Sequence, residues 1–253
     1  MPDADVLILA NGPGEVATWV RPVVQQLHSR WGAAVRISVV LSPCPHATGE
    51  EAQMAQRIPG VNRVQAARNF WPFLFWGRTA AGWDWLPRGV VLFLGGDPFY
   101  TLVCGWRLGY PTLAYAEVQV RWPRWFTALA LANKHLLTQI PKRYRSRARV
   151  VGDLMVAAVG EASLTATTRE QIGFLPGSKP YKLTQGVPFC LTVATWLAHR
   201  CPEIEFVLPV APTLTLSALA RYADPDTNPM INRLGWESAI LEQVGQNYYF
   251  ILR

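Results

Sequence analysis

GVVLFLGGDPF, residues 89–99, joins an uninterrupted apolar run to a glycine pair, an aspartate and a proline. An apolar run without polar alternation is typical of a central parallel strand that is covered on both faces. Aspartate is a strong helix N-cap, and proline favours the first helical position. The stretch therefore predicts a buried strand at 89–96 and a helix at 98–108, with Asp97 at the carboxyl end of the strand.

The sequence on either side repeats this alternation of strand and helix. Strands are predicted at 5–10, 34–41 and 110–117, and the helix after the first of them is expected to end near Arg30. Alternation of this kind is typical of an α/β protein with a parallel sheet. The fold class predicted for the first 165 residues is therefore a Rossmann-like α/β domain.

A second, partial α/β domain with a parallel sheet is predicted for residues 166–253. A strand there leads into the turn LPGSK, and a helix is predicted at 187–200 and a last strand at 248–252. One face of that helix is expected to carry Phe189, Val193, Trp196 and Leu197 at helical spacing. The chain stops directly after a strand, so we expect this domain to be incomplete and the chain to be truncated at its C-terminus.

Composition limits the classes of protein to which the chain can belong. Half of the residues are hydrophobic, 16% are charged, and the net charge is +7, which favours a polyanionic partner such as a phosphorylated ligand or an anionic membrane. The four cysteines lack the spacing of a zinc site or a disulfide framework, so a cytoplasmic setting and no metal are expected. No signal peptide and no apolar run of about 20 residues are present, so a membrane-spanning segment is not predicted.

The turn NGPGE follows the first predicted strand and precedes a helix. Asn11, Gly12 and Gly14 would let a ligand approach the backbone there, and a helix N-terminus favours an anion. The turn lacks the GxGxxG spacing of a dinucleotide site. A tight turn that needs both glycines for its backbone geometry explains the same residues.

The turn PGSK in the second domain repeats this arrangement. The backbone N–H groups of Gly177 and Ser178, together with Lys179, could hold a diphosphate without a metal. Turns of this composition are also common without any ligand.

Two further features each have a functional and a structural interpretation. Asp97 could act as a general base if burial raised its pKa, or it could cap the helix that begins at Pro98. The basic run at 142–149 could bind nucleic acid or anionic headgroups, but no nucleic-acid motif accompanies it. Nucleic-acid binding is therefore not expected.

Taken in order, these motifs resemble the lipid-A-disaccharide synthase family of GT-B glycosyltransferases, in its divergent cyanobacterial and plastid-like branch. The resemblance rests on GPGEV, on VLFLGGDPFYTLVCGWRLGYPTLAYAEVQVRWP, on HLLTQIPKRY and VVGD, and on IGFLPGSKPYKL with CPEIEFVLPVAP. It implies transfer of an acylated glucosaminyl unit from a UDP-sugar to a lipid-linked sugar acceptor, with no cofactor. It also implies that the family's main uridine and diphosphate contacts lie beyond Arg253, so the 253 residues alone are expected to be inactive.

By this resemblance Asp97 corresponds to the catalytic aspartate and Glu15 to the glutamate of the family's GEASGD-type turn. Ser178 and Lys179 correspond to its LPGSR turn near the donor phosphates. Lysine keeps the charge of arginine but lacks its bidentate fork. The chain departs from the family after Glu15, because Ala17, Thr18 and Trp19 stand where the family has serine, glycine and aspartate.

An aromatic cluster occupies the region in which the family meets the membrane and receives acyl chains. Tryptophan is favoured at the boundary between water and lipid. The predicted membrane contacts, of which we expect two or three to be buried instead, are Phe70, Trp71, Phe73, Phe75, Trp76, Trp83 and Trp85. The resemblance thus implies a peripheral protein of the inner, or plastid, membrane. A non-catalytic protein that binds lipid or glycolipid through this cluster is the alternative.

Overall fold

The computed structural model describes residues 2–45, 47, 49–159, 170–210, 214–234, 240–244 and 247–251. The chain divides into two compact units, Met1–Ala162 and Ser163–Arg253, hereafter unit 1 and unit 2. The boundary predicted between residues 165 and 166 lies outside the described residues. Each unit contains its own sheet.

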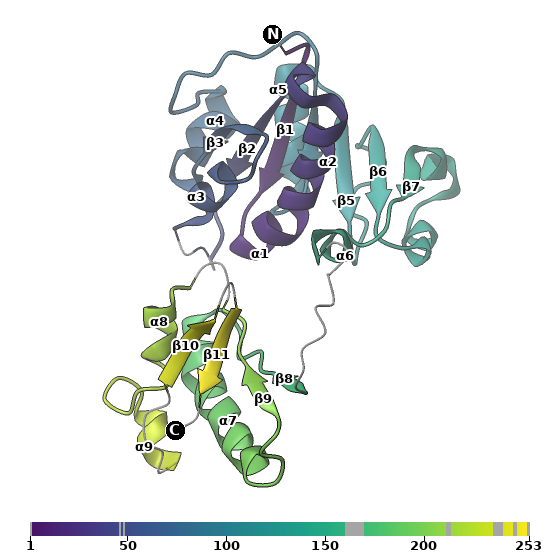
Figure 1. The fold of residues 1–253 in the computed structure, drawn as a ribbon. Coiled ribbons are helices and arrows are strands. Elements are labelled where there is room, and N and C mark those ends of the chain that lie inside the picture. Colours follow the sequence, from purple (N-terminus) through teal and green to yellow (C-terminus); the bar gives the residue numbers. More distant parts are fainter. Residues whose placement is uncertain are drawn as a thin grey trace. The chain divides into compact units, whose positions relative to one another are not determined.

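Unit 1 is built on a seven-stranded sheet in which every strand is parallel to its neighbours, in the order β3-β2-β1-β4-β5-β6-β7 (Figure 1). The α/β class with a parallel sheet is therefore confirmed. The strands are β1 (Ala4–Ala10), β2 (Val35–Leu41), β3 (Val61–Gln65), β4 (Gly89–Phe93), β5 (Thr112–Ala116), β6 (Ala128–Leu131) and β7 (Ala148–Val150).

Helices connect these strands on both sides of the sheet. They are α1 (Pro13–Glu15), α2 (Arg21–Trp31), α3 (Glu51–Gln56), α4 (Phe70–Trp76), α5 (Pro98–Leu108) and α6 (Leu154–Val159). A π-helical turn, Val16–Val20, joins α1 to α2. Short 3₁₀ segments lie at Gly32–Ala34, Ala67–Asn69, Lys134–Gln139 and Lys142–Arg147.

The alternation of side chains along β1 sorts the core of unit 1 into two layers. Val6, Ile8 and Ala10 pack in one cluster with residues of the helical run after β1, while Leu7 and Leu9 pack in another with Phe70 and Phe73 of α4. Successive side chains of a strand point to opposite faces, so a wholly apolar strand requires cover on both. This explains why the central strands lack polar alternation.

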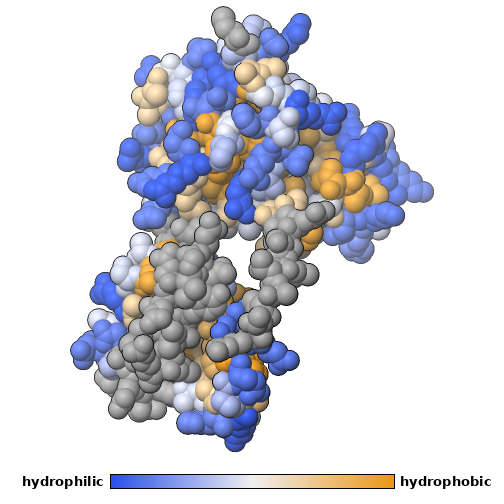
Figure 2. Space-filling model, viewed as in Figure 1, coloured by the Kyte–Doolittle hydropathy of each residue, from blue (hydrophilic) through white to orange (hydrophobic). Residues whose placement is uncertain are grey.

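Apolar side chains remain accessible on the α2 side of the sheet. Figure 2 shows orange, apolar side chains where β5 and β6 lie beside α2 in Figure 1. A groove of about 350 Å³ in unit 1 is lined by side chains that include Leu27, Trp31, Leu113, Val151 and Leu154.

Unit 2 contains a four-stranded sheet in the order β10-β11-β9-β8. Its strands are β8 (Gln171–Gly173), β9 (Glu205–Val207), β10 (Ile240–Val244) and β11 (Asn247–Ile251), and its helices are α7 (Pro180–Ala198), α8 (Leu216–Ala220) and α9 (Pro229–Leu234). β8 and β9 are parallel, but β11 is antiparallel to both β9 and β10. The sheet is mixed rather than parallel as expected there, because two residues between β10 and β11 are too few for a crossover connection.

Helix α7 begins at Pro180, seven residues before the predicted start, and includes Pro188. A proline inside a helix leaves the carbonyl four residues earlier without its N–H donor. Here that carbonyl belongs to Thr184, and it accepts a hydrogen bond from Nδ2 of the buried Asn228 at 3.0 Å. The amide of Asn228 thus replaces the missing N–H, which the local sequence does not reveal.

The predicted apolar face of this helix is also wrong. Phe189 and Trp196 are exposed, whereas the buried side chains of α7 include Leu183, Val187 and Leu191. Because the helix begins at Pro180, Leu183 is part of it. The buried positions Leu183, Val187 and Leu191 then form an apolar stripe on a different face of the helix from the predicted one.

A buried carboxylate joins three strands at the amino-terminal end of the sheet in unit 1. Asp5 on β1 is fully buried and accepts from Arg36 of β2 at both oxygens, at 2.7 and 2.9 Å. It also accepts from the backbone N–H of Leu86 at 2.7 Å and from the hydroxyl of Tyr110 at 3.3 Å. Arg63 of β3 approaches Asp5 at 3.5 Å. Burial and the neighbouring Asp5 raise the pKa of Tyr110 to about 12, so its hydroxyl remains a donor at neutral pH.

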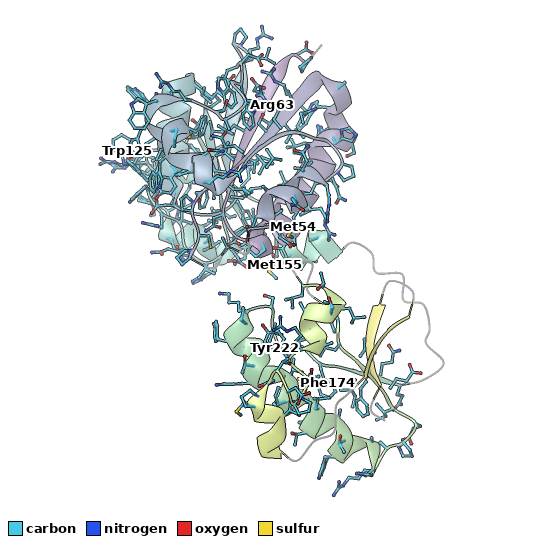
Figure 3. The ribbon with its side chains drawn as sticks, turned by 90° about the vertical axis from the view of Figure 1, so that its left-hand side faces the viewer. Met54, Arg63, Trp125, Met155, Phe174 and Tyr222 are labelled. Atoms are coloured by element: carbon cyan, nitrogen blue, oxygen red, sulfur yellow. The ribbon has the colours of Figure 1, made fainter. Side chains whose placement is uncertain are left out.

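The same arginines hold the segment that follows α4. The guanidinium carbon of Arg63 lies 4.7 Å from the ring centroid of Trp83 and 4.9 Å from that of Trp85. Asp84 between them bonds Arg36 at 2.8 Å, and this hydrogen bond lowers the pKa of Asp84. Figure 3 shows Arg63 well away from Met54 and Met155, which lie near the other end of unit 1.

Replacing Asp5 with alanine should destabilise unit 1 by about 3–5 kcal/mol, because removing one partner of a buried ion pair leaves the other charge uncompensated. Urea unfolding followed by tryptophan fluorescence measures this loss. Asp84→Ala is the matched control, since Asp84 binds the same arginines but its side chain is 74% exposed. Equal losses for the two variants would contradict the role assigned to Asp5.

Candidate active site

The candidate site lies where the order of strands reverses. The chain proceeds from β1 to β2 and β3 on one side and then returns to place β4 on the other side of β1. Ligands of open α/β sheets bind outside the carboxyl ends of the strands at such a point. The segments that follow β1 and β4 are Asn11–Glu15 and Leu94–Asp97, and a hydrogen bond from Leu94 N to Leu9 O at 2.9 Å joins the two strand ends.

Glycines let these two segments approach closely. A Cβ at Gly95 would lie 3.0 Å from Asn11 Oδ1 and 3.1 Å from Glu15 Cγ, and one at Gly12 would lie 2.6 Å from Glu15 Oε2. Gly14, in contrast, is exposed and has no atom within 4 Å of such a position. Neither Gly12 nor Gly14 has a positive φ, so the interpretation that both are needed for backbone geometry is wrong. The end of the Glu15 side chain occupies the space beside Gly12, so a larger residue at position 12 would displace it.

A pocket of about 290 Å³ opens at this point. Its polar lining consists of Asn11, Glu15, Glu117, Gln119 and Arg121. Its larger apolar lining side chains are Trp19, Phe93, Val118, Val120 and Leu129. Carboxylates, an amide and a cation beside apolar walls form the mixture expected of a site for a polar organic ligand.

Asp97 lies beside this pocket and caps α5. Its Oδ1 accepts from the backbone N–H of Phe99 at 2.9 Å, and its Oδ2 faces Arg121 Nη1 at 3.7 Å. The side chain is 41% exposed, so Asp97 is not the buried carboxylate considered from the sequence. The N-cap interpretation is confirmed, and the second oxygen remains directed toward the pocket residue Arg121.

The π-helical turn brings Trp19 into the pocket lining. A π turn accommodates an extra residue in a helix, and such turns are frequent at functional sites. Pro22, the second residue of α2, follows this turn and has no N–H with which to continue the α-helical pattern. The ring of Trp19 packs edge-on against Tyr115 at 5.6 Å, and its Nε1 is buried without a hydrogen-bond partner among the described residues.

The second predicted turn lies in unit 2. Gly177 has a φ of 100°, a conformation that favours glycine, and Lys179 is the N-cap residue of α7. Gly186 of α7 comes so close to Pro176 that an added Cβ would lie 2.9 Å from its carbonyl oxygen. These contacts fix the turn against the first part of a 19-residue helix.

The predicted aromatic membrane contacts divide into three groups. Phe70 and Phe73 are buried in the core, so their prediction as membrane contacts is wrong, although burial of two or three rings was expected. Trp83 and Trp85 are partly buried and pack against the core and Arg63. The exposed rings are Trp71, Phe75 and Trp76 of α4.

Sequence reasoning missed the residues after β5. Glu117 is the last residue of the strand predicted at 110–117, and Gln119 and Arg121 follow it. A position at the carboxyl end of a strand is the same signal that identified Asp97. In the basic run, Arg145 donates to Ile140 O at 3.0 Å and Arg147 to Phe126 O at 3.3 Å. These two arginines therefore satisfy backbone carbonyls.

Within the described residues, no group of three or more His, Cys, Asp or Glu side chains could hold a metal ion.

The fold and the edge site define a GT-B-like α/β protein, and comparison with solved structures supports this class. UDP-GlcNAc 2-epimerase from Neisseria meningitidis, bound to UDP-GlcNAc, aligns with a TM-score of 0.51 and 11% identity over 91% of this chain and 69% of its own. A putative UDP-N-acetylglucosamine 2-epimerase from Listeria monocytogenes aligns with a TM-score of 0.52 and 10% identity over 94% and 68%. At this identity the likeness concerns the fold alone.

Sequence comparison adds a partial similarity to lipid-A-disaccharide synthases. Those of Anaeromyxobacter sp. (strain K) and Anaeromyxobacter dehalogenans (strain 2CP-1 / ATCC BAA-258) are each 42% identical to this chain over 55 residues. The match covers 22% of this chain and 14% of each relative. No protein-family model matches the chain.

The two functions of Asp97 can be separated by substitution. Asp97→Ala should cost about 1 kcal/mol of stability because the cap on α5 is lost, whereas Asp97→Asn should leave stability nearly unchanged because asparagine caps equally well. Urea unfolding of both variants checks this. If Asp97→Asn were as destabilised as Asp97→Ala, the carboxylate charge rather than the cap would support the helix.

Proposed function

We propose that the protein is a glycosyltransferase that moves an acylated glucosaminyl unit from a UDP-sugar to a lipid-linked sugar acceptor. The observation that carries the proposal is the pocket at the reversal of strand order, where Asn11, Glu15 and Arg121 meet beside Asp97. The partial similarity to lipid-A-disaccharide synthases supports the reaction. The fold likeness to a protein whose structure holds UDP-GlcNAc supports the donor class.

The proposed reaction is an inverting transfer with Asp97 as general base. The acceptor hydroxyl attacks the anomeric carbon, the bond from that carbon to the UDP oxygen breaks, and UDP leaves with the electron pair. Asp97 takes the hydroxyl proton on Oδ2, since Oδ1 is occupied by Phe99 N–H. Glu15 accepts a hydrogen bond from another acceptor hydroxyl, and Arg121 holds the Asp97 carboxylate in position.

Unit 2 is proposed to hold the donor, and residues 1–165 the acceptor. Gly177, Ser178 and Lys179 precede α7, where backbone N–H groups and the helix dipole favour a diphosphate. Gly177 has a positive φ, and backbone turns of left-handed conformation occur in known anion-binding sites. Stabilisation of the leaving UDP then comes from N–H groups and a lysine.

A non-catalytic lipid-binding function is a second candidate. It is favoured by Trp19, which lines the pocket at a position where lipid-A-disaccharide synthases, by the resemblance, have an aspartate. A protein of this kind would bind lipid without releasing UDP.

Replacing Asp97 with asparagine should lower transfer at least 100-fold, the lower range for loss of a general base. UDP release from a UDP-linked acylated glucosamine, in the presence of an acylated glucosamine acceptor, measures it. Asp153→Asn is the matched control, because Asp153 also accepts from the N–H two residues on, at 2.8 Å, at the start of α6. Full activity of Asp97→Asn would refute the base, and absence of transfer by the unmodified protein purified from its native source would favour the second candidate.

The exposed rings of α4 are proposed to contact an anionic membrane surface. Within the described residues no helix is long and apolar enough to cross a membrane, so α4 would lie at the interface. Trp71, Phe75 and Trp76 are exposed on this seven-residue helix.

Changing Trp71, Phe75 and Trp76 together to serine should abolish sedimentation with vesicles of anionic phospholipid without changing the melting temperature appreciably, since these rings are exposed. The matched control is Phe189→Ser with Trp196→Ser, which removes two exposed rings of α7. Unchanged vesicle binding by the α4 variant would exclude this contact.

A further inference from the structure

A second apolar groove lies on unit 1, between α5 and the loop that follows β5. It has a volume of about 660 Å³ and is lined chiefly by Phe99, Leu102, Val103, Trp106, Trp122 and Trp125. This volume falls within the range of about 300–1,000 Å³ that is typical of ligand sites. Trp106 is 82% exposed, and Figure 3 shows Trp125 at the outer edge of unit 1.

Arginines border the groove on the side of the loop. The guanidinium carbon of Arg121 lies 5.0 Å from the ring centroid of Trp122, and that of Arg124 lies 4.3 Å from the ring of Trp125. Asp97 is the acidic side chain that faces Arg121, at 3.7 Å, and Arg124 forms no ion pair with any described residue. Cations above an apolar groove complement a molecule with a hydrocarbon chain and an anionic head.

The groove adjoins the candidate active site. Pro98 and Arg121 line the active-site pocket, and the next residue of each, Phe99 and Trp122, lines the groove. The rings of Phe99 and Trp122 are themselves in edge-to-face contact at 6.1 Å. A chain lying in the groove would therefore carry its head group to Arg121, beside Asp97.

We propose that this groove binds one acyl chain of an anionic lipid, and that Arg121 and Arg124 hold its phosphate head. The assignment of that lipid as the sugar acceptor rests on the proposed function, whereas the binding itself does not. The groove is separate from the exposed rings of α4, none of which lines it.

Titration calorimetry with dodecyl phosphate, below its micelle concentration, tests the proposal. One molecule should bind, and decyl phosphate should bind about fifteenfold more weakly, since each buried methylene contributes about fourfold to affinity. Inorganic phosphate should show no binding under the same conditions. No binding of dodecyl phosphate, or equal affinity for inorganic phosphate, would overturn the proposal.

Variants locate the binding. Val103→Phe fills the groove, and Trp125→Ser removes part of its wall. Each variant should weaken dodecyl phosphate binding at least tenfold. Because Trp125 is exposed, Trp125→Ser should still fold. Trp196→Ser is the matched control, because Trp196 is equally exposed and carries Arg200 at 3.8 Å, but belongs to unit 2. Unchanged affinity in both groove variants would overturn the proposal. If dodecyl phosphate binds but no UDP is released, the proposed transferase function is wrong and the proposal of a lipid-binding groove stands. If transfer occurs but dodecyl phosphate does not bind, the groove proposal is wrong and the transferase function stands.

Discussion

The pairing of β1 with a parallel strand on each side is the constraint on which the remainder of unit 1 depends. β1 pairs with β2 over its whole length and with β4 from Asp5 to Leu9. Both ends of β1 are therefore closely surrounded by neighbouring segments, and the contacts that make this packing possible differ between the two ends. At the amino end, the buried Asp5 carboxylate is fully engaged by Arg36, Leu86 and Tyr110. At the carboxyl end, Gly12 and Gly95 provide space for Asn11 and Glu15.

Local chemistry explains which parts of this arrangement the sequence predicts. β4 and α5 are evident because an apolar strand, an aspartate cap and a proline agree with one another at Asp97 and Pro98. The mixed sheet of unit 2 was not foreseen because no strand was predicted at 240–244, so the two-residue connection between β10 and β11 was not recognised. The early start of α7 was missed although proline at the first helical position is a local signal. Pro188 lies near the start of the helix predicted at 187–200, but the observed helix begins at Pro180 and places it in the interior, where Asn228 supplies the donor that the proline lacks.

The site shows the same division. Asn11 and Asp97 were identified because each follows a strand at its carboxyl end, and Glu15 was identified through the family resemblance. The partnership of Asp97 with Arg121, in contrast, spans residues far apart in sequence. The aromatic cluster could not be resolved from composition. Phe70 and Phe73 form core, Trp83 and Trp85 pack around Arg63, and the α4 rings Trp71, Phe75 and Trp76 are exposed. Only tertiary contacts distinguish these three environments of the aromatic side chains.

The proposed function depends on a ligand occupying the pocket formed by the segments after β1 and β4. Hydrogen–deuterium exchange locates a ligand without requiring turnover. With a UDP-linked acylated glucosamine and its acceptor both present, we predict slower exchange of the backbone amides of residues 12, 14–16, 95–97 and 99. Unchanged exchange at these amides, with protection confined to other segments, would contradict the assignment of this edge as the active site.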